Sequence, residues 1–442
     1  MACATITWVM AGALTYTAHP LVRGTSGREE ELGTLSRTRP ARTIGIRGMP
    51  TSCVVGATSY LATELIYQLI VEEGQTVHGA LRGAEEVKFI DNQTGALREL
   101  GASHHARMAA LRTMPHADRR LWLHPLRPLD SCVDSVDVVY HTLASPEGFR
   151  ASESVRLMRD VFDAIERTAA AGGYPAPRVV LTSCADAVMR QPDDKPEGEC
   201  FDEDDWDVWS APDGAEPDAR RHAKVAAERE AWRLADERNV SLAVVNPAFM
   251  VGPARTRHTD GASLRYIRAV LEGEAPPLGD IPMVDVRDAA AAHRLAAWSG
   301  AGRRHLVASA RLVPQRHALA ALRQGLPPHY AIASAESKDE VEPAEASDTA
   351  ATEAAAAEAA AAEARAAALR GGAGAGLAAA FARAAAPPPP PVVVDDRVVF
   401  CGRGLGELGL TLRDVNESLV EMARSVVRSG AIRPRQGYPD EL

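Results

Sequence analysis

The sequence has no hydrophobic run that approaches the ~20 apolar residues needed to cross a bilayer, so a membrane partner is not predicted. CxxC pairs are also missing, and the six cysteines, at positions 3, 53, 132, 184, 200 and 401, are scattered. This spacing predicts neither a zinc cluster nor a disulfide framework, and it favours a reducing compartment. A basic excess is absent too. The net charge of -10 disfavours nucleic acid as a partner.

Apolar residues, by contrast, are plentiful: they make up 46% of 442 residues, enough for one sizeable core or two modest domains. Residues 1–48 lack the basic start of a secretory signal. Their Arg, Ser, Thr and Gly content loosely resembles a transit peptide, although the acidic triplet 29–31 opposes that interpretation. We therefore expect a cytoplasmic protein with a disordered leader. Organellar targeting by this leader, or an artefact of the gene model, remains open.

Strand-like and helix-like segments alternate along most of the chain. Residues 51–58 are short, β-branched and end in a glycine turn, which predicts a buried strand. Residues 60–73 carry apolar side chains at helical spacing, and 76–82 form a second strand. The pattern recurs in strands at 136–144, 177–188 and 240–253 and in helices at 152–172 and 220–239. It predicts an α/β fold, a Rossmann-type doubly wound parallel sheet with ligands at the carboxyl ends of its strands.

A low-complexity stretch interrupts this alternation. Residues 334–395 run through an Ala/Glu tract, a Gly-rich break and a polyproline run. Such a composition predicts a helical or extended insertion outside the core, acting as a flexible spacer or as a helix that binds a partner. We expect residues 49–333 to form the core of the fold and residues 396–436 to return to it after the insertion.

Eight segments are informative when they are taken together and in order. They are CVVGATSYLATEL (53–65), VDVVYHTLASP (136–146), RVVLTSCADAV (178–188), FDEDDW (201–206), AKVAAEREAW (223–232), VNPAFMVGP (245–253), VDVRDAAAAH (284–293) and LGELGLTLRDVNESLVEMARSVVRSGAI (405–432). Each resembles the corresponding motif of the extended short-chain dehydrogenase/reductase family, in its dihydroflavonol reductase and cinnamoyl-CoA reductase branch. The resemblance implies a Rossmann fold that binds a nicotinamide dinucleotide. It also implies that residues 49–333 are the nucleotide-binding core with segments of the substrate region, and that 396–436 complete a smaller C-terminal substrate region.

The resemblance also implies where the cofactor would bind. In the family, glycines of a GxxGxxG turn let the backbone amides of a helix N-terminus approach a pyrophosphate. Here the three positions are Gly56, Ser59 and Ala62, so the turn is either a weakened nucleotide site or one that no longer binds. The implied cofactor-binding residues are Gly56, Thr58, Ser59, Tyr60, Leu61, Arg82, Ala144, Ser145, Lys224, Pro247 and Val251.

Arg82 bears on the choice of cofactor. In the family that the chain resembles, an arginine at the end of the second strand contacts the 2′-phosphate of NADP, and a guanidinium suits a phosphate in two-pronged geometry. The acidic residue that would bind the NAD ribose is absent, because Gly83 and Ala84 follow. We expect NADP rather than NAD. The alternative is an ordinary surface arginine.

The catalytic motif of the family, YxxxK with a serine, is largely altered. Lys224 takes the lysine position, but Arg220 stands where the tyrosine belongs. Cys184 falls at the serine position, with Ser183 before it. An arginine does not release its proton near neutral pH, so it cannot act as the general acid, although it can stabilise an oxyanion. Either these four residues form an altered reductase site, or Arg220 and Lys224 are solvated helix charges.

These observations support three functions. The first is an NADP-dependent oxidoreductase that reduces an aldehyde, ketone or CoA thioester, or oxidises the matching alcohol of a small molecule. The second is a catalytically lapsed family member that binds a nucleotide or a protein partner. The third is a nucleotide-sugar epimerase or dehydratase.

We predict no metal. The acidic run 202–207 favours a solvated loop over a cation site, and adjacent His104 and His105 would face opposite ways in a strand.

Overall fold

The computed structural model describes most of the predicted core. The described residues are 48–81, 110–143, 151–189, 191–211, 218–255, 261–274, 280–300, 302–327, 330, 332, 397–430 and 432. The predicted leader and low-complexity insertion lie outside them, apart from Gly48, and so do His104 and His105. Within this part of the chain, no helix is both long and apolar enough to span a membrane.

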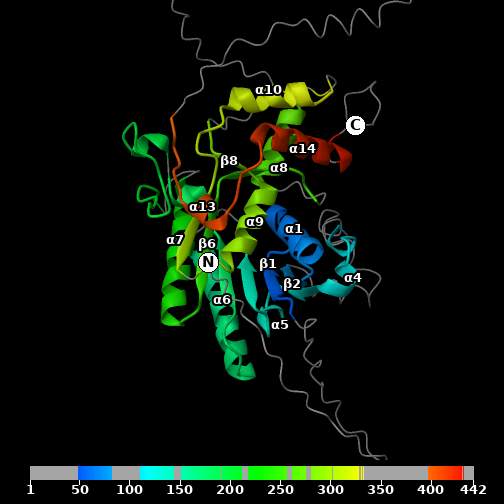
Figure 1. Cartoon of the computed structure of the whole chain (residues 1–442), viewed down its shortest axis with the longest axis vertical. Coiled ribbons are helices and arrows are strands. Elements are labelled where there is room, and N and C mark those ends of the chain that lie inside the picture. The colour runs from blue at the N-terminus through cyan, green and yellow to red at the C-terminus, as the bar shows by residue number, and fades with distance from the viewer. Residues whose placement is uncertain are drawn as a thin grey trace, which may run out of the picture. The chain divides into compact units, whose positions relative to one another are not determined.

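A seven-stranded parallel sheet forms the centre of the structure, in the order β3-β2-β1-β4-β5-β6-β9 (Figure 1). The order reverses at β1, which pairs with β2 on one side and with β4 on the other. Ligands of such sheets bind beyond the carboxyl ends of the strands at this switch point. The strands are β1 (Thr51–Val55), β2 (Thr76–Leu81), β3 (Leu121–Pro125), β4 (Val138–His141), β5 (Arg178–Thr182), β6 (Leu242–Pro247) and β9 (Arg303–Val307).

Helices cover both faces of the sheet, as the alternation of strands and helices predicts. They are α1 (Tyr60–Tyr67), α4 (Ala117–Arg120), α5 (Asp130–Val133), α6 (Ala151–Gly172), α7 (Asp218–Glu237), α8 (Ala262–Leu271), α9 (Val286–Ala296), α10 (Gln315–Gly325), α13 (Gly404–Leu408) and α14 (Val415–Arg428). Helix α1 continues as a π-helical turn, η1 (Gln68–Glu72), and short 3-10 turns η3 (Ala185–Ala187) and η4 (Pro192–Asp194) follow β5.

Side-chain alternation along the strands separates two hydrophobic layers. In β1, Val54 packs in the layer that contains α1 and α9, whereas Cys53 and Val55 pack in the layer that contains α5, α6 and α7. Figure 1 shows α6 and α7 on one side of the sheet and α1 and α9 on the other. Because both faces are covered, the strands are nearly continuous hydrophobic runs, as in β6.

The predicted strand 240–253 is in fact two strands, which is a correction. Strand β6 ends at Pro247, and β7 (Phe249–Val251) pairs instead with β8 (Met283–Asp285) in a separate two-stranded sheet. Pro247 has no N–H to continue the first ladder, and the amide of Ala248 bonds to the carbonyl of Val307 in β9. This small sheet packs against α14, which also contacts α8 and α10 near the top of Figure 1.

The prediction of no disulfide framework is wrong. Cys53 of β1 is bonded to Cys132 of α5, and Cys200 is bonded to Cys401. Sequence separations of 79 and 201 residues hide both pairs from a search for short cysteine motifs, since only the fold brings the partners together. Cys184 is the free cysteine of the described residues.

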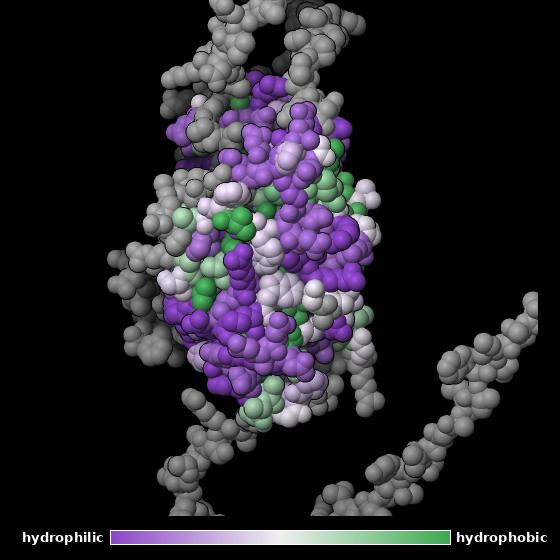
Figure 2. Space-filling model, turned by 90° about the vertical axis from the view of Figure 1, so that its left-hand side faces the viewer, coloured by the Kyte–Doolittle hydropathy of each residue, from purple (hydrophilic) through white to green (hydrophobic). Residues whose placement is uncertain are grey.

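The surface on the side of α7 and the loop 191–211 is largely hydrophilic (Figure 2). Hydrophobic residues are scattered over this face rather than gathered into one broad patch. Isolated exposed apolar residues are normal on protein surfaces and indicate no binding face by themselves.

Across the described residues, no group of three or more His, Cys, Asp or Glu side chains is placed to hold a metal ion.

Candidate functional site

The turn after β1 depends on glycine at its first position. Gly56 has φ +91°, and a Cβ there would lie 3.0 Å from the Cα of Leu143, just beyond β4. Its amide bonds to the carbonyl of Ala80 in β2 at 2.9 Å. The chain segments after β1 and β4 therefore approach each other at the switch point, where only a residue without a side chain fits.

Ser59 takes the second glycine position without strain. Its φ of -72° is ordinary, and its hydroxyl accepts a hydrogen bond from the amide of Ala62 at 3.2 Å, capping α1. The Ser59 hydroxyl therefore occupies one amide that could otherwise donate to a phosphate. The amides of Tyr60 and Leu61 are not used within the helix, because no helical turn precedes them. The start of α1 retains free donors for an anion.

The side chains of Tyr60 and Leu61 anchor the start of α1 in the core. The phenol of Tyr60 donates to the carbonyl of Gly252 at 2.6 Å, and both side chains are buried. Burial, followed by the charges of Asp285 and Glu64, raises the pKa of Tyr60 well above its usual value, so the phenol remains protonated.

Arg82, Ala144 and Ser145, three other predicted cofactor residues, lie outside the described residues.

A pocket beyond the carboxyl ends of β4 and β5 brings together three of the four predicted catalytic residues. Its lining combines these ends with α6 and α7: His141, Leu143, Ser154, Leu157, Met158, Leu181, Thr182, Ser183, Arg220, Ala223, Lys224, Ala227 and Glu228. Leu143 also contacts Gly56, so the pocket adjoins the turn after β1. Of the remaining predicted residues, Cys184, Thr58, Pro247 and Val251 do not line it.

Lys224 and His141 offer polar groups with no partner among the described residues. Lys224 is half-buried, and no described carboxylate lies within ion-pair distance of its ammonium. His141 is 2% exposed, and neither ring nitrogen has a hydrogen-bond partner in the described chain. Burial, with a smaller effect from Lys224, lowers the pKa of His141 to about 3, so the ring is neutral. These groups lining the pocket are suited to a polar ligand.

Arg220 is held in place by an acidic residue. Its guanidinium is 2.9 Å from a carboxylate oxygen of Asp186 in η3. Next to this pair, burial and then the charge of Asp186 raise the pKa of the Cys184 thiol to about 12, although Lys224 opposes the shift. Cys184 is therefore a neutral thiol, which excludes the reactive thiolate that a nearby lysine would favour.

Glu228 anchors the base of the pocket. It is fully buried on α7 and accepts hydrogen bonds from Ser183 Oγ at 2.5 Å, from Asn246 Nδ2 at 3.0 Å and from Arg304 Nε at 2.6 Å. Because a serine hydroxyl has one proton, Ser183 donates it to Glu228 and faces any ligand with its lone pairs. Ser183 therefore lies in the pocket but has no proton left for a substrate oxygen.

Sequence reasoning missed Glu228, Asp186 and Arg304. Glu228 lies four residues after Lys224, so helical spacing alone places both on one face of α7 and is a signal that it belongs to the pocket. No such signal exists for Arg304, which comes from β9, or for Asp186, whose pairing depends on the turn after β5.

A nicotinamide dinucleotide fits these residues. The Gly56 turn and the first amides of α1 form a cradle for a pyrophosphate. Lys224 and His141, which have no partner in the part of the chain that the structure describes, line the pocket at the next strand end. The departures from the family motif at Ser59 and Ala62 leave the Gly56 turn and the first amides of α1 in place, and the other departures, Arg220 and Cys184, lie at the proton-donating positions.

Substitution of Gly56 by alanine tests the cradle. We expect Gly56→Ala to lower the free energy of unfolding by about 2–4 kcal/mol, because strain at positive φ adds to a clash with the Leu143 backbone. Gly173→Ala is the control: its φ is +68°, but nothing lies within 4 Å of an added Cβ, so only the strain of about 1 kcal/mol applies. Urea denaturation measures both variants, and equal losses would contradict the close approach at Gly56.

Known proteins with similar sequences are reductases. The chain is 31% identical over 299 residues to cinnamoyl-CoA reductase 1 of Arabidopsis thaliana, covering 66% of this chain and 79% of that protein. It is 32% identical to cinnamoyl-CoA reductase 1 of Petunia hybrida, covering 55% of this chain and 67% of the relative. Tetraketide alpha-pyrone reductase 2 of Arabidopsis thaliana is 29% identical, over 55% of this chain and 72% of that protein. No family model matches the sequence.

Solved structures agree on the fold. Vestitone reductase from alfalfa (Medicago sativa L.) superposes with a TM-score of 0.58 at 16% identity, covering 87% of this chain and 100% of that one. Yeast methylglyoxal/isovaleraldehyde reductase Gre2, complexed with NADPH, superposes with a TM-score of 0.57 at 17% identity, covering 86% and 99%. These superpositions agree on the fold. The sequence identity to the Arabidopsis reductase shows that the chain belongs to the extended short-chain dehydrogenase/reductase family, in the branch that holds the cinnamoyl-CoA reductases.

Proposed function

We propose that this protein is an NADP-dependent oxidoreductase that reduces the carbonyl of a small molecule slowly, with Lys224 as its central catalytic residue. The observation that carries the proposal is the position of Lys224. Its ammonium, without a described ion-pair partner, lines a pocket that adjoins the glycine turn after β1. Carbonyl reduction is what the similar reductases suggest, and an aldehyde, ketone or CoA thioester is the expected substrate class.

When bound, the nicotinamide cofactor supplies the hydride. The residues of this chain then have to stabilise the oxygen that becomes negative. Lys224 and Arg220 place two cations at the pocket, and the pairing with Asp186 holds the guanidinium in one orientation. Leu143, Leu157 and Met158 contribute apolar side chains to the pocket lining.

The supply of a proton distinguishes this site from that of its relatives. Arg220 cannot release a proton near neutral pH, Ser183 donates its proton to Glu228, and the Cys184 thiol, which is only partly exposed, is a weak donor. Lys224 is thus the best proton donor of the four predicted catalytic residues. A lysine ammonium is a weaker acid than an activated tyrosine with a matched pKa, so turnover is expected to be slow.

NADP is preferred to NAD in this proposal because of Arg82, which ends the second strand in sequence, with no acidic residue after it. The NADPH bound by yeast Gre2 fits that preference.

A lapsed family member that binds the dinucleotide without turnover is the second candidate. It is favoured by the commitment of the Ser183 proton to Glu228 and of Arg220 to Asp186.

Titration of the purified protein with NADPH, followed by tryptophan quenching and coenzyme fluorescence, tests the proposal. We expect micromolar binding by the wild type and a loss of at least tenfold in Lys224→Met, because a cation that faces the ligand is removed. Arg233→Met is the control, since Arg233 lies on the same helix, is half-exposed and pairs with Glu230 and Glu237 outside the pocket. Affinity equal in both variants would contradict the role of Lys224.

Activity assays then separate the two candidates. Consumption of NADPH with aldehydes, ketones or CoA thioesters supports the reductase. Binding without consumption of NADPH supports the lapsed member. An absence of binding at millimolar NADPH would exclude both candidates.

A further inference from the structure

The chain re-enters the described structure at a segment that is bound tightly to a distant loop. The guanidinium of Arg397 donates to the carbonyls of Pro192 and Lys195 at 2.8 and 2.7 Å, and it pairs with Asp193 at 2.9 Å. The amide of Phe201 bonds to the carbonyl of Val399 at 2.8 Å. We call residues 397–404 the C-terminal strap, since they fasten the end of the chain onto the loop 192–205.

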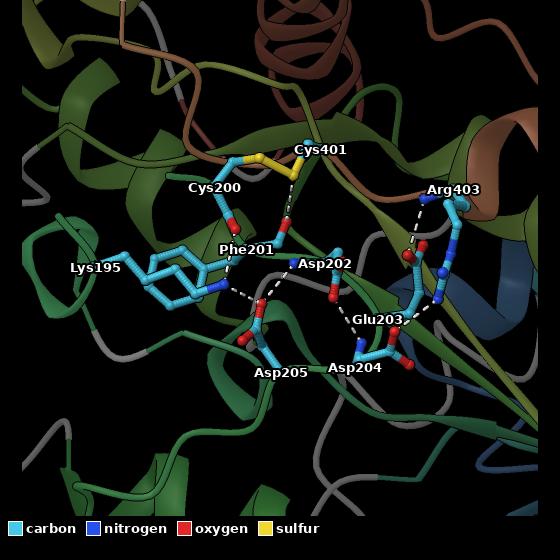
Figure 3. Close-up of a disulfide and its surroundings, with 9 residues drawn as sticks. All are labelled: Lys195, Cys200, Phe201, Asp202, Glu203, Asp204, Asp205, Cys401 and Arg403. Atoms are coloured by element: carbon cyan, nitrogen blue, oxygen red, sulfur yellow. Dashed lines mark hydrogen bonds and ion pairs between the residues drawn. A yellow bond between two sulfur atoms is a disulfide. The ribbon is translucent and has the colours of Figure 1, made fainter. Parts of the chain in front are cut away.

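A disulfide closes this strap at its centre (Figure 3). Cys200 and Cys401 flank the paired residues Phe201 and Phe400, whose rings lie 6.3 Å apart. Cys401 is exposed and Cys200 is partly exposed. The other disulfide is its opposite, because Cys53 and Cys132 are both 0% exposed between the sheet and α5. One chain therefore holds an accessible disulfide and an inaccessible one.

The strap continues from the disulfide to the base of the pocket through direct contacts. The carboxylate of Glu203 accepts hydrogen bonds from the strap amides of Arg403 and Gly404 at 2.8 and 2.7 Å, and from the amide of Leu306 in β9 at 3.2 Å. Arg304 of β9 donates to the backbone carbonyl of Glu203 at 2.8 Å and pairs with Glu228 at 2.6 Å. Glu228 in turn holds Ser183.

We propose that Cys200–Cys401 is a reversible modification site that undergoes thiol–disulfide exchange with a dithiol. A thiolate of the dithiol attacks the sulfur of Cys401, which is the more exposed residue of the pair, the S–S bond breaks, and Cys200 leaves with the electron pair and takes up a proton. The second thiolate then attacks the mixed disulfide and releases Cys401, which is also protonated. Two electrons and two protons reach the protein, and the dithiol becomes a disulfide.

Accessibility limits this reaction to one of the two disulfides, because the attacking thiolate must reach a sulfur along the S–S axis. Cys184 does not compete as an internal attacker, since burial raises its pKa to about 12 and keeps it a thiol. On reduction, the strap loses its covalent link but keeps Arg397 and the paired phenylalanines as weaker attachments. The amides of Arg403 and Gly404 then open more often to solvent, which loosens one support of Arg304.

Differential alkylation of the intact protein tests the exchange itself. The protein is incubated with increasing dithiothreitol, and free thiols are blocked with iodoacetamide. The protein is then denatured and fully reduced, and the thiols released from the remaining disulfides are labelled with N-ethylmaleimide. We expect Cys200 and Cys401 to acquire iodoacetamide at least a hundredfold faster than Cys53 and Cys132. Equal rates for the two pairs, or reaction of Cys200 and Cys401 only upon global unfolding, would overturn the proposal.

Hydrogen exchange measured by mass spectrometry tests the effect on the strap. We expect at least a tenfold loss of protection at peptides containing Cys401 to Gly404 in the reduced protein and in a Cys200→Ser/Cys401→Ser variant, with no change in β1. A Cys184→Ser control is expected to leave these peptides as in the wild type. Unchanged protection of the strap after reduction would show that the disulfide does not govern it. Neither measurement depends on NADPH binding or on turnover.

Discussion

Exchange of Arg220 for tyrosine together with Cys184 for serine is expected to raise the carbonyl reduction rate by about two to four orders of magnitude. A positioned general acid contributes typically 10²–10⁴-fold to such a reaction, and Arg220 cannot act as one. Lys224 is four residues further along the same face of α7 and lines the same pocket, so the new phenol lies beside an ammonium that lowers its pKa. The measurement is kcat for NADPH-dependent reduction of a panel of aldehydes.

Asp186 requires a matched variant in this experiment. It pairs with Arg220 in the wild type, and once the arginine is replaced its carboxylate would raise the pKa of the tyrosine. We therefore expect a further gain when Asp186→Ala is added to the double variant, and a return toward the wild-type rate when Lys224→Met is added. An unchanged rate in the double variant would mean that Arg220 does not occupy the position of the family's tyrosine.

The fold was predictable because its signals are local. The β-branched run before Gly56, the helical spacing after it and the lysine of α7 are all read within about 15 residues of sequence, and the structure places them in the expected elements. Lys224 reaches the pocket because a parallel sheet brings the carboxyl ends of β4 and β5 to one edge. The strands and helices follow from periodicity and topology, whereas Lys224 was singled out by the resemblance of its helix to the family motif.

The supports of the site were not predictable, because they join residues that only the finished fold brings together. Arg304 follows Glu228 by 76 residues, and Cys401 follows Cys200 by 201. The continuous strand expected at 240–253 failed for a related reason: whether the ladder continues past Pro247 depends on a partner strand, β8, which is more than 30 residues away. Sequence patterns of period 2 or 3.6 do not contain such pairings.

Glu228→Ala is expected to be among the most destabilising single substitutions in the chain, lowering the free energy of unfolding by about 3–5 kcal/mol. The carboxylate is fully buried, and the Arg304 side chain, 8% exposed, would remain as a buried cation whose main counter-charge is gone. Ser183 and Asn246 would lose their common acceptor as well. Urea denaturation followed by circular dichroism measures the loss.

Glu230→Ala is the matched control, because Glu230 lies two residues further along the same helix. Glu230 is itself 9% exposed, but its partners Arg159 and Arg233 are 57% and 47% exposed, so water can solvate both guanidinium groups when the carboxylate is removed. The loss is therefore expected to cost about 1 kcal/mol. Glu228→Gln should fall between the two, since its amide oxygen still accepts from Ser183 while the charge that balances Arg304 is absent. If Glu228→Ala were no more destabilising than Glu230→Ala, the buried pair would contribute nothing to stability, and water would have to reach the guanidinium of Arg304, whose side chain is 8% exposed in the wild type.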